Sequence, residues 1–152
     1  MPPKYPVLRP ITIKDRLKLQ PLLDRTENSI CELNFSNLII WEDFDHPQIT
    51  TIHNNFCILI SSPIEEPYFL EPLGSQKIIE TVDLYLKEKS KIAPVSEKFL
   101  YSLPAEKYQT TCLRNQFDYI YQTTSLAQLK GKDFDGKRNH INKFKNKNPH
   151  YK

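Results

Sequence analysis

The chain has 152 residues, of which 39% are hydrophobic and 26% are charged, and its formal net charge is +3. This length suits one domain with a buried core, and the composition excludes wholesale disorder. The longest purely apolar run is Phe56–Ile60, whereas a membrane-spanning helix needs about 20 such residues. The N-terminal residues also lack the apolar stretch of a secretory signal. We therefore expect a cytoplasmic protein without a transmembrane segment.

The first third of the chain predicts a strand followed by two helices. Residues 7–13 are strand-like, and Thr12 with Asp15 resembles the capping box that starts a helix. Pro21 is expected to divide that helix into two pieces, because proline lacks an N–H. A second helix is predicted over residues 35–44, with Asn34 as its N-cap.

A three-stranded meander comes next, with strands predicted at residues 49–53, 56–61 and 68–71. Asn54 and Asn55 suit a tight hairpin turn between the first two strands. After Ser75, the apolar residues Ile78, Val82, Tyr85 and Leu86 recur at helical spacing, which predicts an amphipathic helix.

The remaining elements are shorter. A helix is predicted from Ser96 to Leu103, strands at residues 109–113 and 117–122, and a helical turn or two at 125–130. A loop at 131–136 then precedes a last helix at 137–147. This order predicts a mixed α/β (α+β) fold with a mostly antiparallel central sheet flanked by helices, in a single domain over residues 1–152.

The cysteines and histidines do not indicate a metal site or a disulfide framework. Cys31, Cys57 and Cys112 are odd in number and widely spaced. Each lies in or beside an apolar stretch, so we expect buried structural thiols. Glu42 and His46 are four residues apart and could bind a metal, but we favour a surface cluster at a helix end. The other histidines have no such partner, and we predict no bound metal.

Charge is distributed unevenly, and residues 131–152 form a basic C-terminal loop and helix. Residues 128–152 carry eight Lys and Arg against two Asp, and residues 137–152 carry no acid. On a helical wheel Ile141 and Phe144 share one face with Lys137 between them, and further basic residues flank that face. A polyanion contact and a solvated helix packed on the core both explain this pattern. Since soluble surfaces usually mix both signs, we favour the polyanion: tRNA, a cofactor phosphate or an anionic lipid head group. The candidate contact residues are Lys137, Arg138, Asn139, His140, Asn142 and Lys145.

Two other motifs are weaker. Residues 131–137 fit the first seven positions of a phosphate-binding P-loop, but Arg138 stands where the magnesium-binding Ser or Thr belongs and no buried strand precedes the motif. This argues against nucleotide hydrolysis. Asp118 lies in an alternating aromatic run, where core and cross-strand packing is one interpretation. A general base or an amine-binding carboxylate is the other.

Three blocks of the sequence resemble the phosphatidylglycerol lysyltransferase C-terminal domain family. Residues 29–41, SICELNFSNLIIW, resemble the family signature SE-x-x-F-x-N-L-x-x-W. Residues 118–121 followed by 126–132, and residues 137–144, KRNHINKF, resemble later blocks. The resemblance covers nearly the whole chain from about residue 7, and the spacing between the blocks also fits.

The resemblance implies a GNAT-like acyl-CoA N-acyltransferase fold, used twice in tandem in that family. Family members are about twice as long, so the chain would correspond to the N-terminal half. The implied activity is transfer of an acyl or aminoacyl group from acyl-CoA or aminoacyl-tRNA to an amine or hydroxyl, once a second GNAT-like half completes the enzyme. Lys137, Arg138, Asn139 and Asn142 match the family motif, and the resemblance assigns no catalytic role to any of them.

The resemblance implies no permanently bound cofactor. The expected partners are tRNA or CoA phosphate, a second half or a second copy, and peripherally an anionic membrane surface. A different interpretation is a catalytically incomplete binding or interaction module left by truncation. It predicts an exposed apolar face where the other half would dock.

Overall fold

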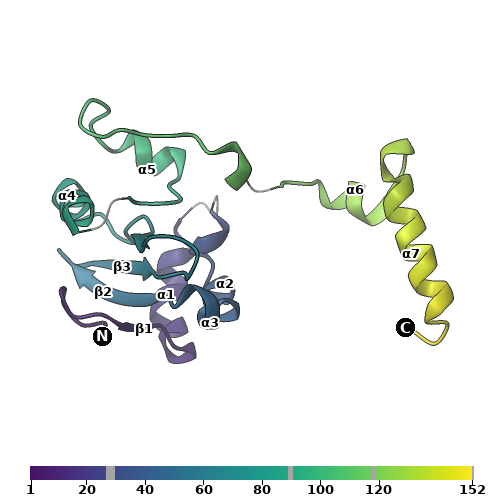
Figure 1. Ribbon diagram of the computed structural model, residues 1–152, viewed down its shortest axis with the longest axis horizontal. Helices are drawn as coiled ribbons and strands as arrows, with labels where there is room; N and C mark the ends of the chain where they lie inside the picture. Colours follow the sequence, from purple (N-terminus) through teal and green to yellow (C-terminus); the bar gives the residue numbers. More distant parts are fainter. Residues whose placement is uncertain (27–29, 89–90, 118, 152) are drawn as a thin grey trace. The chain divides into compact units, whose positions relative to one another are not determined.

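The computed structural model describes residues 1–26, 30–88, 91–117 and 119–151 (Figure 1). Contacts divide the chain into two compact units, Met1–Cys112 and Leu113–Lys152, and each is described by itself. The first unit contains, in order, β1 (Arg9–Pro10), α1 (Arg16–Leu23), α2 (Phe35–Ile40), α3 (Glu42–Asp45), β2 (Gln48–Ile52), β3 (Asn55–Ile60), β4 (Tyr68–Phe69), α4 (Ile78–Glu88) and α5 (Glu97–Tyr101). The second unit contains α6 (Thr123–Gln128) and α7 (Asp135–Lys147), with single 3-10 turns at Arg114–Gln116 and Lys132–Phe134.

The described strands of the first unit form one antiparallel sheet in the order β1-β2-β3-β4. Its centre is the β2–β3 hairpin, paired from Gln48 opposite Leu59 to Ile52 opposite Asn55. The turn residues are His53 and Asn54, which both adopt positive φ, as a two-residue hairpin turn requires. The predicted hairpin is confirmed, but its turn lies one residue earlier than expected and Asn55 belongs to β3.

The sheet is covered by helices on both faces, because β3 carries apolar residues on both faces. Ile58 and Ile60 belong to one hydrophobic cluster, which also contains core residues of α1 and α2. Cys57 and Leu59 belong to a second cluster with Tyr85 of α4. The ring of Tyr85 stacks on that of Phe69 at 4.0 Å between centroids. The mixed α+β fold, with an antiparallel sheet flanked by helices, is thus confirmed.

Two helix predictions need correction. Helix α1 continues through Pro21 to Leu23 instead of dividing there. Proline removes one backbone hydrogen bond, and Leu19 and Leu23, on either side of it, are held in the core. The helix expected over residues 35–44 breaks at Trp41 into α2 and α3. The cap of α2 is confirmed, since the Ser36 N–H donates to Asn34 Oδ1 at 2.9 Å.

The cysteines are not alike. Cys57 is buried, whereas Cys31 and Cys112 are exposed, so the expectation of three buried thiols holds for Cys57 alone. Burial raises the pKa of the Cys57 thiol to about 11, which keeps it protonated at neutral pH. The hydroxyl oxygen of Tyr85, in the same cluster, is inaccessible to solvent and has no hydrogen-bond partner among the described residues.

The strands expected at residues 109–113 and 117–122 are absent from the described part of those segments. Tyr119 and Ile120 are 87% and 93% exposed. A strand needs a neighbour to take its backbone hydrogen bonds, and no neighbouring strand pairs with the described residues here. The helices expected at 125–130 and 137–147 are present as α6 and α7.

Candidate functional site

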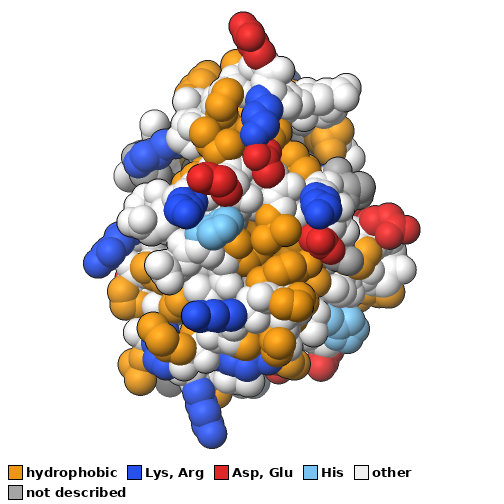
Figure 2. Space-filling view, turned by 90° about the vertical axis from the view of Figure 1, so that its left-hand side faces the viewer, with side chains coloured by type: hydrophobic (Ala, Val, Ile, Leu, Met, Phe, Trp, Pro, Cys, Tyr) orange, Lys and Arg blue, Asp and Glu red, His pale blue; other side chains and the backbone are white. Residues whose placement is uncertain are grey.

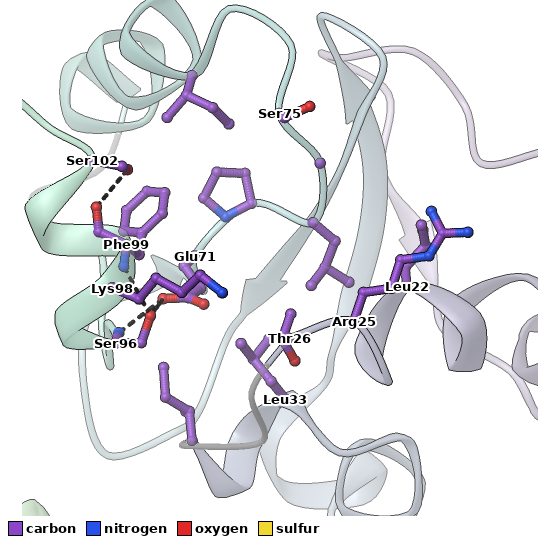
Figure 3. Close-up of a pocket in the computed structure, with 15 residues that line it drawn as sticks. Leu22, Arg25, Thr26, Leu33, Glu71, Ser75, Ser96, Lys98, Phe99 and Ser102 are labelled. Atoms are coloured by element: carbon purple, nitrogen blue, oxygen red, sulfur yellow. Dashed lines mark hydrogen bonds between the residues drawn. The ribbon is translucent and has the colours of Figure 1, made fainter.

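A pocket of about 610 Å³ opens in the first unit (Figure 3). It lies between the residues that follow α1, the connection from β4 to α4, and helix α5. This volume is within the range of small-molecule sites. The wall is largely apolar, with contributions from Leu22, Ile30, Leu33, Leu73, Ile78 and Phe99. Its size and lining make it a candidate small-molecule site in the first unit.

The acidic residue that lines this pocket is Glu71, which is 7% exposed. The residue follows β4, and its Oε2 accepts hydrogen bonds from the Ser96 N–H at 2.8 Å and the Ser96 hydroxyl at 2.9 Å. The Ser96 hydroxyl oxygen in turn accepts from the Phe99 N–H at 3.1 Å and caps α5. Glu71 therefore fixes the start of α5 against the sheet, and the predicted start of this helix at Ser96 is confirmed.

The second unit holds the residues predicted to contact a polyanion. Lys137, Arg138, Asn139, His140, Asn142 and Lys145 all lie on α7. Apart from Arg138, which is half-buried, all of these side chains are exposed. Lys137 lies 5.9 Å from the centroid of the Tyr121 ring, in a cation–π contact. The apolar residues of this helix, Ile141 and Phe144, are 42% and 48% exposed.

Arg138 differs from its neighbours because its guanidinium is bonded within the unit. It donates to the carbonyl of Leu129, to that of Gly131 at 2.9 Å, and pairs with Asp135. These bonds hold the loop before α7, so Arg138 is a structural residue in this arrangement. The P-loop-like segment follows helix α6 and not a strand, so the expectation that no buried strand precedes it is confirmed.

The face of the molecule in Figure 2 mixes acidic and basic side chains with hydrophobic ones between them. Helix α7 differs, since Asp135 is its one acid and pairs with Arg138. Among residues 119–151, that pair is also the sole ion pair formed by α7. The lysines of α7 are consequently available to an external anion.

The other predicted site residue, Asp118, lies outside the described residues. Within the described ranges, no group of three or more His, Cys, Asp or Glu side chains is placed to hold a metal ion. The same ranges contain no helix that is both long enough and apolar enough to cross a bilayer.

Sequence reasoning missed the pocket and its carboxylate. The sequence pattern places Glu71 at the end of a strand and Ser96 at the start of a helix, without a link between them. One signal is present: Glu71 is a lone acid within the apolar stretch of residues 68–73. A charged residue among buried apolar ones is rarely left without a role. Its partner 25 positions away cannot be read from spacing.

The comparisons with known proteins agree with the resemblance noted from the sequence. The family described as "Phosphatidylglycerol lysyltransferase, C-terminal" matches residues 24–152. A solved structure of a conserved protein of unknown function from Bacteroides thetaiotaomicron VPI-5482 is similar, with a TM-score of 0.71 and 28% sequence identity over 95% of this chain. The match covers 52% of that protein, so the chain spans about half of its length. No curated protein matches. Because the family match covers most of the sequence, the chain belongs to the phosphatidylglycerol lysyltransferase C-terminal family.

Proposed function

We propose that this chain is part of an acyl or aminoacyl transferase and that α7 binds the polyanionic donor, for which tRNA is the best candidate. The observation that carries the proposal is the positive charge of the four α7 lysines, which no acid of the second unit's described residues neutralises. Lys137, Lys143, Lys145 and Lys147 have no ion-pair partner among residues 119–151. The family relation supplies the reaction class, since the family is described as the C-terminal part of a lysyltransferase.

The distribution of charge favours tRNA over CoA as the occupant. Helix α7 has 13 residues, which corresponds to about 20 Å at 1.5 Å per residue. The lysines extend over most of this length and lie on two sides of the apolar face formed by Ile141 and Phe144. A nucleic acid backbone offers phosphates over such a span, whereas CoA concentrates its phosphates at one end.

The test is the salt dependence of tRNA binding to the whole chain. Each neutralised single-stranded phosphate contributes about −0.7 to the slope of log affinity against log salt. The double variant Lys137→Ala/Lys145→Ala should bind more weakly, with a slope shallower by about 1 to 2 units. Fluorescence anisotropy at several salt concentrations measures both quantities. Arg138 is left unchanged because it holds the loop before α7.

A matched control is Lys14→Ala/Lys87→Ala, which removes two exposed lysines of the first unit. It should leave the slope unchanged. Salt-independent binding, or an equal loss in the control, would contradict a specific role for α7. If CoA competes with tRNA at equal phosphate concentration, the donor is CoA and the tRNA assignment is wrong.

A second candidate function is that of an interaction module, favoured by the apolar side chains that the second unit exposes. The set comprises Leu113, Phe117, Tyr119, Ile120, Tyr121, Ile141 and Phe144. A contiguous exposed apolar patch larger than roughly a few hundred Å² is unusual in a monomer, and these residues are candidates for such a patch. The proposed occupant is a polypeptide equivalent to the part of the Bacteroides thetaiotaomicron protein that the match does not cover.

Light scattering of the chain, alone and co-expressed with that polypeptide, tests the second candidate. A one-to-one complex that Ile120→Asp weakens by at least about tenfold supports it, because a buried charge at such a contact is costly. The control is Ile64→Asp, an exposed isoleucine of the first unit. If the chain self-associates, the occupant is a second copy. If the chain remains monomeric and does not bind the polypeptide, the interaction-module function is wrong.

A further inference from the structure

We infer that the pocket beside Glu71 binds an apolar primary amine, whose ammonium group donates to the Glu71 carboxylate. The inference depends on the pocket in the first unit and requires neither helix α7 nor a transfer reaction. It is argued from three observations: a carboxylate without a counter-charge among the described residues, three lining hydroxyl groups that can only accept hydrogen bonds, and an apolar wall.

The carboxylate has one oxygen available. Both hydrogen bonds to Glu71 end on Oε2, and no described residue donates to Oε1. Among the described residues, the Tyr85 hydroxyl is the one solvent-inaccessible side-chain oxygen that lacks a hydrogen-bond partner. Since Oε1 of Glu71 also lacks a partner, it must retain some accessible surface. Because Glu71 lines the pocket and is otherwise buried, that surface faces the cavity.

Within the described part of the chain, Glu71 is also without a cationic partner. The ion pairs among described residues join other groups, and none includes Glu71. A mostly buried carboxylate is costly unless it is paired. Two cations line the same pocket, but the Arg25 guanidinium points outward from it in Figure 3. Lys98 takes part in an interaction of its own. An ammonium group from a ligand would supply the missing counter-charge.

Three of the four hydroxyl groups that line the pocket already donate their hydrogen within the protein, and the fourth belongs to Ser75. The hydrogen of Thr26 is donated to the Leu23 carbonyl at 2.6 Å, and that of Ser102 to the Phe99 carbonyl at 2.6 Å. The Ser96 hydrogen is donated to Glu71. Since a hydroxyl has one hydrogen and two lone pairs, these three groups can accept from a ligand but have no proton left to give. These three hydroxyl groups therefore favour a ligand rich in donors, as an ammonium group is.

The remaining wall determines the rest of the ligand. Leu33, Leu73 and Ile78 offer aliphatic surface, and Phe99 adds an aromatic ring. Burying apolar surface contributes about 25 cal/mol per Å², so an alkyl or aryl body should add to the affinity. The pocket consequently fits an amine attached to an apolar group, not a small hydrophilic amine.

The experiment uses 4-phenylbutylamine as the probe, with 4-phenylbutanol as its neutral analogue and 5-phenylpentanoate as its acidic analogue. Calorimetry on the whole chain measures each affinity. The amine should bind at least about tenfold more tightly than the alcohol, since a hydrogen bond between charged groups is worth more than a neutral one. Glu71→Gln should remove this preference and leave the affinity for the alcohol nearly unchanged.

Two further variants make the outcome decisive. Glu97→Gln alters an exposed acid of α5 outside the lining and should retain the preference for the amine. Ser75→Trp, at an exposed lining position, should block all three probes without touching the buried bonds, and it tests the site even if Glu71→Gln fails to fold. If the acid binds as tightly as the amine, or if Ser75→Trp binds the amine as tightly as the parent chain does, the inference is overturned. Lys137→Ala/Lys145→Ala should bind the amine as tightly as the parent chain does. The amine site and the proposed function of α7 can therefore fail independently of each other.

Discussion

Gly74→Ala is expected to lower the free energy of unfolding by about 3 kcal/mol. Gly74 has φ of +151°, a conformation that residues with a side chain rarely adopt. A Cβ at this position would lie 2.3 Å from Oδ1 of Asn55 and 3.2 Å from its Cα. The second contact is with backbone, so rotation of the Asn55 side chain cannot relieve all of the overlap.

The crowded neighbour is itself an anchor of the fold. Asn55 is fully buried at the start of β3. Its Oδ1 accepts from the Gln76 N–H at 3.0 Å, and its Nδ2 donates to the Gln76 carbonyl at 2.6 Å and to Thr81 Oγ1 at 3.1 Å. These bonds fasten the loop before α4, and α4 itself, to the hairpin. Displacing the amide would leave buried polar groups without partners, at about 1–3 kcal/mol for each group.

Urea unfolding followed by circular dichroism measures the loss. The matched control is Gly136→Ala in α7, where a Cβ meets nothing within 4 Å and φ is not in the positive range. That change should be neutral or slightly stabilising, because alanine favours helix over glycine by up to about 1 kcal/mol. An equal loss of stability in both variants would show that the position of Gly74 has no special role.

The role of Asn55 illustrates what the sequence can and cannot predict. The strand-like runs on either side of Asn54 predict the hairpin. The continuous apolar residues of β3 then contact helices on both faces of the sheet. The local caps at Asn34 and Ser96 are also predictable, since both bonds close within three residues. The same local pattern assigns Asn55 to the turn, which is wrong. Its partners are 21 and 26 positions away, and no local pattern carries that information.

The same limit explains the errors after residue 108. The residues from 109 to 122 have the alternation of strands, yet strand formation depends on a neighbour that local sequence does not specify. Helix α7 is predictable because its hydrogen bonds are internal to the segment. For the candidate sites the result is similar: the basic residues of α7 can be identified from the sequence. Glu71 cannot be identified in this way, because its role depends on the hydrogen bond from Ser96, which is 25 positions away.

Asp15→Asn is expected to cost about 2 kcal/mol of stability at neutral pH, below the range for fully buried pairs. The Asp15 carboxylate is 7% exposed and accepts two bonds from the Arg9 guanidinium, at 2.8 and 2.6 Å. It also accepts from the Thr12 N–H at 2.9 Å, which completes the predicted capping box before α1. The expected loss of stability is smaller than for a fully buried pair, because the Arg9 side chain is 35% exposed and water screens the pair.

The variant should also change how stability depends on pH. The Arg9 guanidinium, with help from Thr12, holds the pKa of the Asp15 carboxyl far below its usual range. In the unfolded chain an aspartate titrates at about pH 3.9. A depressed pKa in the folded state means that the stabilisation is fully present above the unfolded pKa and is lost as the pH falls below about 4. The amide that replaces the carboxyl cannot titrate, so the variant should lose less stability on acidification than the parent chain does.

Urea midpoints between neutral pH and about pH 2.5 test this expectation, since that window includes the titration of the unfolded carboxyl. Asp43→Asn, which neutralises an exposed acid of α3, is the control and should follow the parent curve. If the parent and Asp15→Asn curves remain parallel through this window, the ion pair does not contribute to the acid sensitivity. If they converge as the pH falls, the Arg9–Asp15 pair is a main link between β1 and the start of α1, because the stability that the variant lacks is the stability that protonation removes.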